Sequence, residues 1–142
     1  MKINIYARVI VVGVAMASAG CQTDSKRQVL MMDSSQVALR SIQTRAFETT
    51  DYNRTVRTVI ATLQDLGFVI DKADHELGTV TATKLDGYVV RMTVTVRPRG
   101  PKQTAVRANA QFGVFAVSDA KPYQQFFVAL EKAMFLTANE VN

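Results

Sequence analysis

The residues best suited to chemistry gather around the one histidine of the chain. His75 lies between Asp74 and Glu76, and Asp71 shortly precedes them. Imidazole and carboxylate groups transfer protons and bind metal ions, so this cluster is the first candidate for catalysis or for a weak surface metal site. Catalysis would need a nucleophile beside the histidine, and zinc would need three or four converging ligands. We expect a solvated polar loop instead, with no metal and no cofactor.

The remaining side chains offer little more to an enzyme. No serine lies in a nucleophile elbow, and the glycines stand singly in turns rather than in a phosphate-binding loop. A carboxylate pair such as Glu48 and Asp51 is a glycosidase-type alternative. The sequence therefore predicts a protein that is not an enzyme.

The single cysteine follows a segment with the features of an export signal. Lys2 and Arg8 provide a basic start, and residues 9–19 form a run of small and apolar residues. That run is shorter than the ~20 residues that a membrane-spanning helix needs. We therefore predict a cleaved signal peptide over residues 1–20, which makes Cys21 the first residue of the mature chain.

Cys21 has the sequence context of a lipid-attachment site. Together with Ser18, Ala19 and Gly20 it resembles the lipobox of bacterial lipoproteins, in which a signal peptidase cuts before a diacylated cysteine. Ser18 replaces the leucine that is usual there, and an ordinary signal with an incidental cysteine is the alternative. Gln22, rather than aspartate, follows the cysteine, and by resemblance this indicates a lipid anchor in the outer membrane, facing the periplasm.

The composition is that of an ordinary globular chain. Of its 142 residues 48% are hydrophobic and 20% are charged, which suits one domain with a buried core. The formal charge of +5 includes Lys2 and Arg8, so the mature chain carries 15 basic against 12 acidic residues. This excess is too small for a nucleic-acid-binding surface, and we expect no nucleic-acid partner.

The mature chain is expected to begin with a tether. Residues 21–39 are polar and mixed apart from an apolar patch at residues 29–32, which could dock on the domain, the membrane or a partner. A flexible segment of this length spans ~20–25 Å, enough to hold a domain clear of lipid headgroups. Residues 40–142 then form a single periplasmic α+β domain.

Alternation and helical spacing predict the first elements of this domain. Residues 42–47 alternate as a short strand, and residues 49–51 provide a helix start in which a threonine caps and Asp51 complements the helix dipole. Apolar residues then recur at helical spacing until Gly67, with Thr58 among the outward-facing positions. Gly67 ends the helix because glycine adopts the left-handed conformation without steric cost.

Four further strands and a last helix complete the pattern. The strands are expected at residues 68–70, 79–84, 88–97 and 106–112, separated by a polar turn at 71–78, a tight turn at Asp86-Gly87 and a break at 98–102. Tyr88 and Phe112 fall on the apolar side of their strands. Asp119 is expected to cap the last helix, whose apolar stripe runs from Tyr123 to Met134.

This order predicts an α+β fold with two layers. An antiparallel sheet of about five strands is covered by two helices, in the order β-α-β-β-β-β-α. The solvent-facing side of the sheet carries Arg91, Arg97 and Arg107 among threonines, with Arg107 near either Arg97 or Arg91 according to the register. Such arginines can bind carboxylates or phosphates, and a solvated face that discourages edge pairing is the alternative.

Two resemblances extend this interpretation. The segment from Gln43 to Thr49, the segment from Leu63 to Asp71, and Leu77-Gly78 with Ala82-Thr83-Lys84 look like those of a group of small uncharacterised bacterial lipoproteins. A helix that runs into Leu-Gly-Phe and a strand is also similar to the helix-grip domains in the C lipoprotein of the outer-membrane β-barrel assembly machinery. This fold-level resemblance implies a periplasmic accessory role that works through protein contacts.

We therefore expect a non-enzymatic accessory lipoprotein that acts as an interaction module of an envelope assembly. Its contact surface would be the sheet face, a sheet edge, or the last helix, where Phe126, Val128, Phe135 and Leu136 spread wider than one stripe. The alternative is a periplasmic domain that binds a small apolar ligand in a cavity between sheet and helix.

Overall fold

The computed structural model describes residues 35–85 and 87–139, and it describes the side chains as far as Phe135 at its C-terminal end. The chain divides into two compact units, Met1–Ala38 and Leu39–Asn142. The predicted signal peptide, the lipobox residues Ser18, Ala19, Gly20 and Cys21, and the tether up to residue 34 lie outside the described residues. Within the described residues, no helix has the length and apolar character to cross a membrane.

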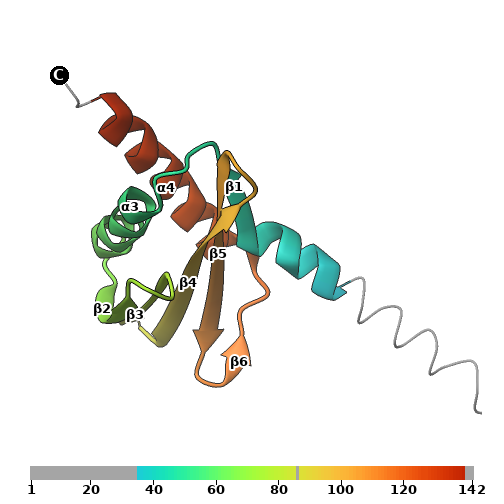
Figure 1. The fold of residues 1–142 in the computed structure, drawn as a ribbon. Coiled ribbons are helices and arrows are strands. Elements are labelled where there is room, and N and C mark those ends of the chain that lie inside the picture. The colour runs from blue at the N-terminus through green and yellow to red at the C-terminus, as the bar shows by residue number, and fades with distance from the viewer. Residues whose placement is uncertain (1–34, 86, 140–142) are drawn as a thin grey trace, which may run out of the picture. The chain divides into compact units, whose positions relative to one another are not determined.

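The second unit is an antiparallel sheet covered on one face by two helices (Figure 1). Its elements are β1 (Thr44–Phe47), α3 (Tyr52–Asp65), β2 (Val69–Asp74), β3 (Thr79–Leu85), β4 (Val89–Arg99), β5 (Gln103–Phe112), β6 (Phe115–Ala116) and α4 (Ala120–Asn139). The strands lie in the order β1-β5-β4-β3-β2, and β6 pairs with the end of β5. The predicted α+β architecture is confirmed, with one short strand more than expected.

Several boundaries differ from the sequence prediction. Residues 35–43 are helical, so the first strand begins at Thr44 rather than at residue 42. β2 continues to Asp74 through residues expected in a turn, because an edge strand exposes one side to water and tolerates charged residues. β4 passes Pro98 and ends at Arg99, since a proline near a strand end forfeits little ladder hydrogen bonding.

The first long helix is fixed at both ends by local interactions. Asp51, rather than a threonine, is its N-cap, and its Oδ1 accepts a hydrogen bond from Arg54 N at 2.9 Å. Gly67 follows the helix with φ 82°, as predicted. Thr58 is buried rather than outward-facing, and its hydroxyl donates to Arg54 O at 2.9 Å, so the buried hydroxyl is paired.

The core lies between the helices and the inner face of β3, β4 and β5. Alternate strand residues are fully buried there, and they meet the inner stripes of α3 and α4. The largest buried side chains are Tyr123, Phe126, Phe127, Leu63, Met92 and Leu130. Asp119 Oδ1 accepts a hydrogen bond from Lys121 N at 3.0 Å, so the predicted start of the last helix is confirmed.

One glycine is required where three elements meet. Gly78 is buried with φ 60°, and its carbonyl accepts a hydrogen bond from Val96 N at 2.7 Å. A Cβ at this position would lie against the hydroxyl of Tyr52 and the carbonyl oxygen of Val96. The turn between β2 and β3 therefore packs tightly against both α3 and β4.

Candidate functional site

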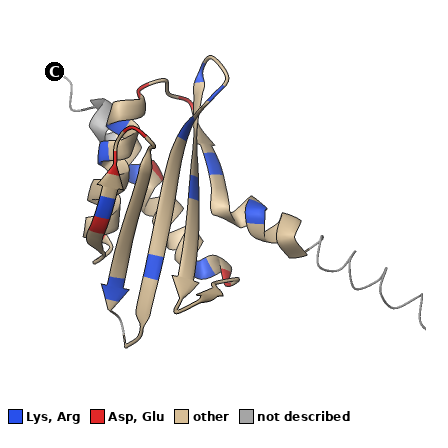
Figure 2. Cartoon of the chain, turned by 60° about the horizontal axis from the view of Figure 1, so that its bottom comes forward, with Lys and Arg blue, Asp and Glu red and all other residues tan. Residues whose placement is uncertain are grey.

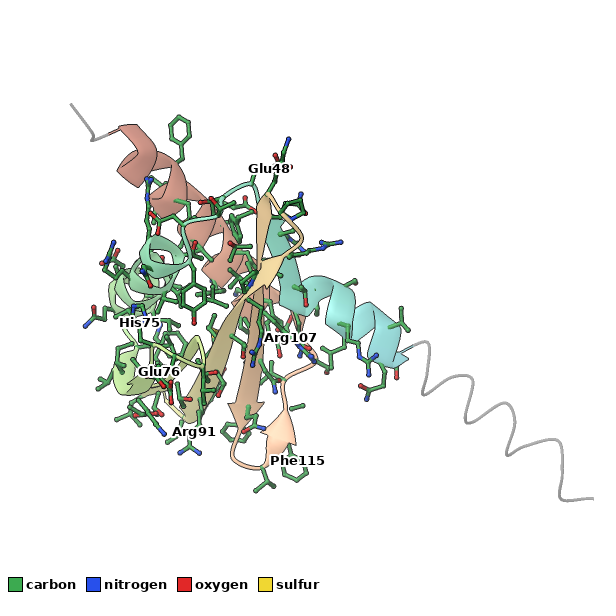
Figure 3. All side chains as sticks on the ribbon, in the orientation of Figure 1. Glu48, His75, Glu76, Arg91, Arg107 and Phe115 are labelled. Atoms are coloured by element: carbon green, nitrogen blue, oxygen red, sulfur yellow. The ribbon has the colours of Figure 1, made fainter. Side chains whose placement is uncertain are left out.

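The histidine cluster is held by structural interactions. His75 and Glu76 are exposed on the turn between β2 and β3, and the carbonyl of His75 accepts a hydrogen bond from Tyr52 OH at 2.8 Å (Figure 3). Asp74 Oδ1 accepts from the backbone of this turn, and Asp71 Oδ2 accepts from Thr83 Oγ1 at 2.6 Å. Within the described ranges no group of three His, Cys, Asp or Glu side chains is placed to hold a metal.

The carboxylate pair considered from the sequence also has separate duties. Asp51 caps α3, as described above, whereas Glu48 Oε1 accepts a hydrogen bond from Gln103 Nε2 at 3.1 Å. Each carboxylate thus serves a different neighbouring element, one the helix and the other β5.

The register of the sheet decides which arginines are neighbours. Arg107 lies opposite Thr95, and Arg97 lies opposite Ala105, so these two arginines are diagonal neighbours on the open face. Such diagonal positions are about 7–8 Å apart. Arg91 lies farther along β4, opposite Gln111. The structure therefore groups Arg97 with Arg107 and places Arg91 apart from them, toward the hairpin ends.

The four adjacent strands β1, β5, β4 and β3 contain no acidic residue. Acidic side chains lie instead on β2 and in loops and helices, whereas lysines and arginines mark the central strands (Figure 2). The open face of the sheet is thus a basic surface without internal acidic partners on those strands. An anionic group could approach it without repulsion from neighbouring carboxylates.

Arg107 is joined to a buried polar network that reaches around the sheet. Arg107 Nη2 donates to Gln43 Oε1 at 3.4 Å, and Gln43 is almost fully buried. Gln43 Nε2 lies 3.3 Å from Tyr123 OH and 3.4 Å from Asn109 Oδ1. The tyrosine hydroxyl donates to Val117 O at 2.7 Å. This network connects the residue before β1 with the open face and with α4.

A second surface lies where the β3–β4 and β5–β6 hairpins end. Leu85, Val114 and Phe115 are 79%, 87% and 72% exposed, and the rings of Tyr88 and Phe112 meet edge to face at 5.2 Å between centroids. We call this group the hairpin-end patch, and its members are Leu85, Tyr88, Val89, Phe112, Val114 and Phe115. Figure 3 shows Phe115 and Arg91 at this same end of the sheet.

The exposure of two patch residues corrects the sequence prediction. Tyr88 and Phe112 were expected in the core by strand alternation, but they are 59% and 49% exposed. Both lie at strand ends, where the helices no longer cover the sheet, so alternation continues without burial. A usable signal was the set of large apolar residues directly around the turn glycines Gly87 and Gly113.

The last helix offers a smaller exposed surface. Val128 and Phe135 are exposed, whereas Phe126 is fully buried in the core. The side chain of Leu136 lies outside the described residues. The helix thus presents separate apolar side chains to solvent rather than the broad stripe considered from the sequence.

The space between sheet and helices contains the packed core of buried side chains. A pocket of about 130 Å³ lies at the sheet end, between Leu66 and Phe68 on one side and Tyr88 and Pro122 on the other. Lys84 and Phe68 both line this pocket, with Lys84 Nζ 5.9 Å from the centre of the Phe68 ring. This volume is well below the roughly 300–1,000 Å³ typical of sites for drug-sized ligands.

Comparison with known proteins assigns no family. No protein-family model matches the chain, and no curated protein matches it. The surfaces of the domain therefore carry the functional argument.

Proposed function

We propose that this chain is a lipid-anchored, non-enzymatic interaction module of an envelope assembly, which binds a protein partner through the hairpin-end patch. The observation that supports this is the exposure of six large apolar side chains at the ends of two adjacent hairpins. Extended apolar patches on a soluble domain are costly to leave in water and typically mark sites of interaction.

The composition of the patch favours a protein partner. Tyr88, Phe112 and Phe115 supply aromatic area, and Arg91 lies at the same end of β4, on the opposite face from the Val90–Phe112 pair. Aromatic residues and arginine are enriched in the centres of protein interfaces, where they provide most of the binding energy. The basic strands beyond the patch would favour a partner with an acidic rim.

The sequence of the first hairpin disfavours a lipid bilayer as the occupant. Asp86 lies between Leu85 and Gly87 in the chain, so insertion of this hairpin would bring a carboxylate toward hydrocarbon. Placing an aspartate at the bilayer centre costs ~2.5–3.5 kcal/mol even on the most permissive scale. We assign membrane attachment instead to the lipid on Cys21.

Copurification from membranes tests this proposal. The tagged full-length protein is crosslinked in its own cells and compared with V114D, in which a highly exposed side chain of the patch becomes charged. V128D on α4 is the matched control, because it changes an exposed valine on the alternative surface. We expect one envelope protein to copurify with the wild type and V128D, and to be lost from V114D.

Two further arms separate the surfaces. If V128D loses the partner and V114D retains it, the docking surface is the last helix and the proposed patch is wrong. The double variant R97E/R107E tests the open sheet face, and we expect it to weaken capture less than V114D does, because these arginines lie beyond the patch. Loss of capture only in this double variant would transfer the site to the sheet face.

A further inference from the structure

The side chain of Arg54 is held in an unusual state near the start of α3. Its Nε and Nη2 atoms are buried and have no hydrogen-bond partner among the described residues. Unpaired buried donors of a charged group are costly, because folding removes their water without replacing it. Buried polar groups without partners are uncommon, so this guanidinium calls for a ligand or another specific reason.

The two unpartnered atoms define one edge of the guanidinium. The N–H groups of Nε and Nη2 point the same way, and together they form the side-on fork that binds both oxygens of a carboxylate. Two described carboxylates have other hydrogen-bond partners, since Asp51 Oδ1 accepts from the backbone N of Arg54 and Glu48 Oε1 accepts from Gln103. Within the part of the chain that the structure describes, the fork therefore has no anionic partner.

Arg54 lines a pocket whose other walls are partly apolar and partly polar. The pocket has a volume of about 290 Å³ and lies between the β1–α3 connection and the C-terminal half of α4, which run past one another in Figure 1. Phe47 and Met134 are partly buried in its wall, and Phe135 is exposed beside them. A ligand in this pocket would meet the Arg54 side chain, the three apolar side chains, and the polar Glu48 and Thr49.

We propose that this pocket binds a small monocarboxylic acid with an apolar tail. The carboxylate pairs with the Nε and Nη2 edge of Arg54, and the tail lies on Phe47, Met134 and Phe135. This site is separate from the hairpin-end patch and goes beyond the proposed docking function. Glu48 also lines the pocket, so its charge opposes the anion and limits affinity.

The test uses octanoate with the full-length chain in lipid nanodiscs. The Nε–H NMR signal of Arg54 is identified by its absence in R54Q, and empty nanodiscs correct for octanoate that enters the lipid. R57Q is the matched control, because it removes the same charge from an exposed position on the same helix. We expect R54Q to lower octanoate affinity by about ten- to a hundredfold and R57Q to leave it unchanged.

Three more arms test the chemistry. E48Q should bind octanoate more tightly than the wild type, and acetate and 1-octanol should bind more weakly, since each lacks one half of the ligand. Equal affinity of R54Q and wild type, or no octanoate binding by the wild type at millimolar concentration, would overturn the proposal.

Thermal unfolding without ligand distinguishes the proposed carboxylic-acid site from an ion pair of Arg54 within the chain. R54Q should unfold at or above the wild-type temperature, because the unpaired donors are removed. Glu140 directly follows α4 in the sequence. If R54Q and either E48Q or E140Q instead lower the unfolding temperature equally, Arg54 pairs with a carboxylate of the chain itself. That result would contradict the site.

Discussion

Replacing Tyr123 by Phe should destabilise the domain far more than the loss of one hydroxyl suggests. The Tyr123 hydroxyl donates to Val117 O at 2.7 Å and accepts from Ala110 N at 3.2 Å. It thereby substitutes for a neighbouring strand at the edge of β5, between the stretches paired with β1 and β6. Without it, the buried N–H of Ala110 would have no acceptor.

The expected magnitude follows from counting the groups left unpaired. Loss of the bond to Val117 O costs about 1 kcal/mol, and a buried backbone donor without a partner adds about 1–3 kcal/mol. Gln43 Nε2 also loses this hydroxyl but keeps Asn109 Oδ1. We therefore expect the free energy of unfolding to fall by about 2–4 kcal/mol, a large share of a small domain's stability.

The Tyr52→Phe variant is the matched control. It deletes the same atom, but the lost bond is a single exposed one to His75 O, worth about 0.5–1 kcal/mol. Equilibrium urea unfolding measures both changes, and amide exchange at Ala110 reports the edge directly. If Y123F costs no more than Y52F, the edge of β5 does not depend on this hydroxyl and the reasoning is refuted.

Three further predictions follow from the same structure. Gly78→Ala should lower the free energy of unfolding in urea by about 2–5 kcal/mol, because it adds both left-handed backbone strain and overpacking. Gly113→Ala, with open space around it, should lower it by only about 1–3 kcal/mol. Similar losses in the two variants would argue against the close packing at Gly78. Val94→Asp should abolish cooperative thermal unfolding followed by circular dichroism, because it buries an unpaired charge, and Thr93→Asp on the open face should not. Cys21→Ser should move the protein from the membrane to the soluble fraction without changing its unfolding temperature, and retention in the membrane would contradict the lipid anchor.

Much of the fold could be predicted because local and global signals agree. The alternation in β4 and β5, the glycine after α3 and the aspartate before α4 each have a local physical cause, and each is found where expected. The predictions were wrong where pairing across the sheet overrides composition. β2 is strand through Asp74 because β3 supplies its hydrogen bonds, a fact absent from its own polar sequence.

The surfaces were less predictable because they depend on register and coverage. The sequence identified Arg91, Arg97 and Arg107 on one face, but only the pairing of β4 with β5 brings Arg97 next to Arg107. Similarly, the exposure of Tyr88 and Phe112 depends on where the helices stop covering the strands. Gln43 and Arg54 carried no sequence signal. Gln43 bonds to Tyr123, which is distant in the chain, and the buried Arg54 donors have no hydrogen-bond partner among the described residues.

Site-specific photocrosslinking tests the central claim most directly. A photoreactive residue replaces Phe115 in the hairpin-end patch or Val128 on α4, in the membrane-anchored protein within its own cells. The docking account predicts one discrete protein adduct from position 115 and none from position 128. Adducts from position 128 alone, or adducts to lipid alone at position 115, would contradict it.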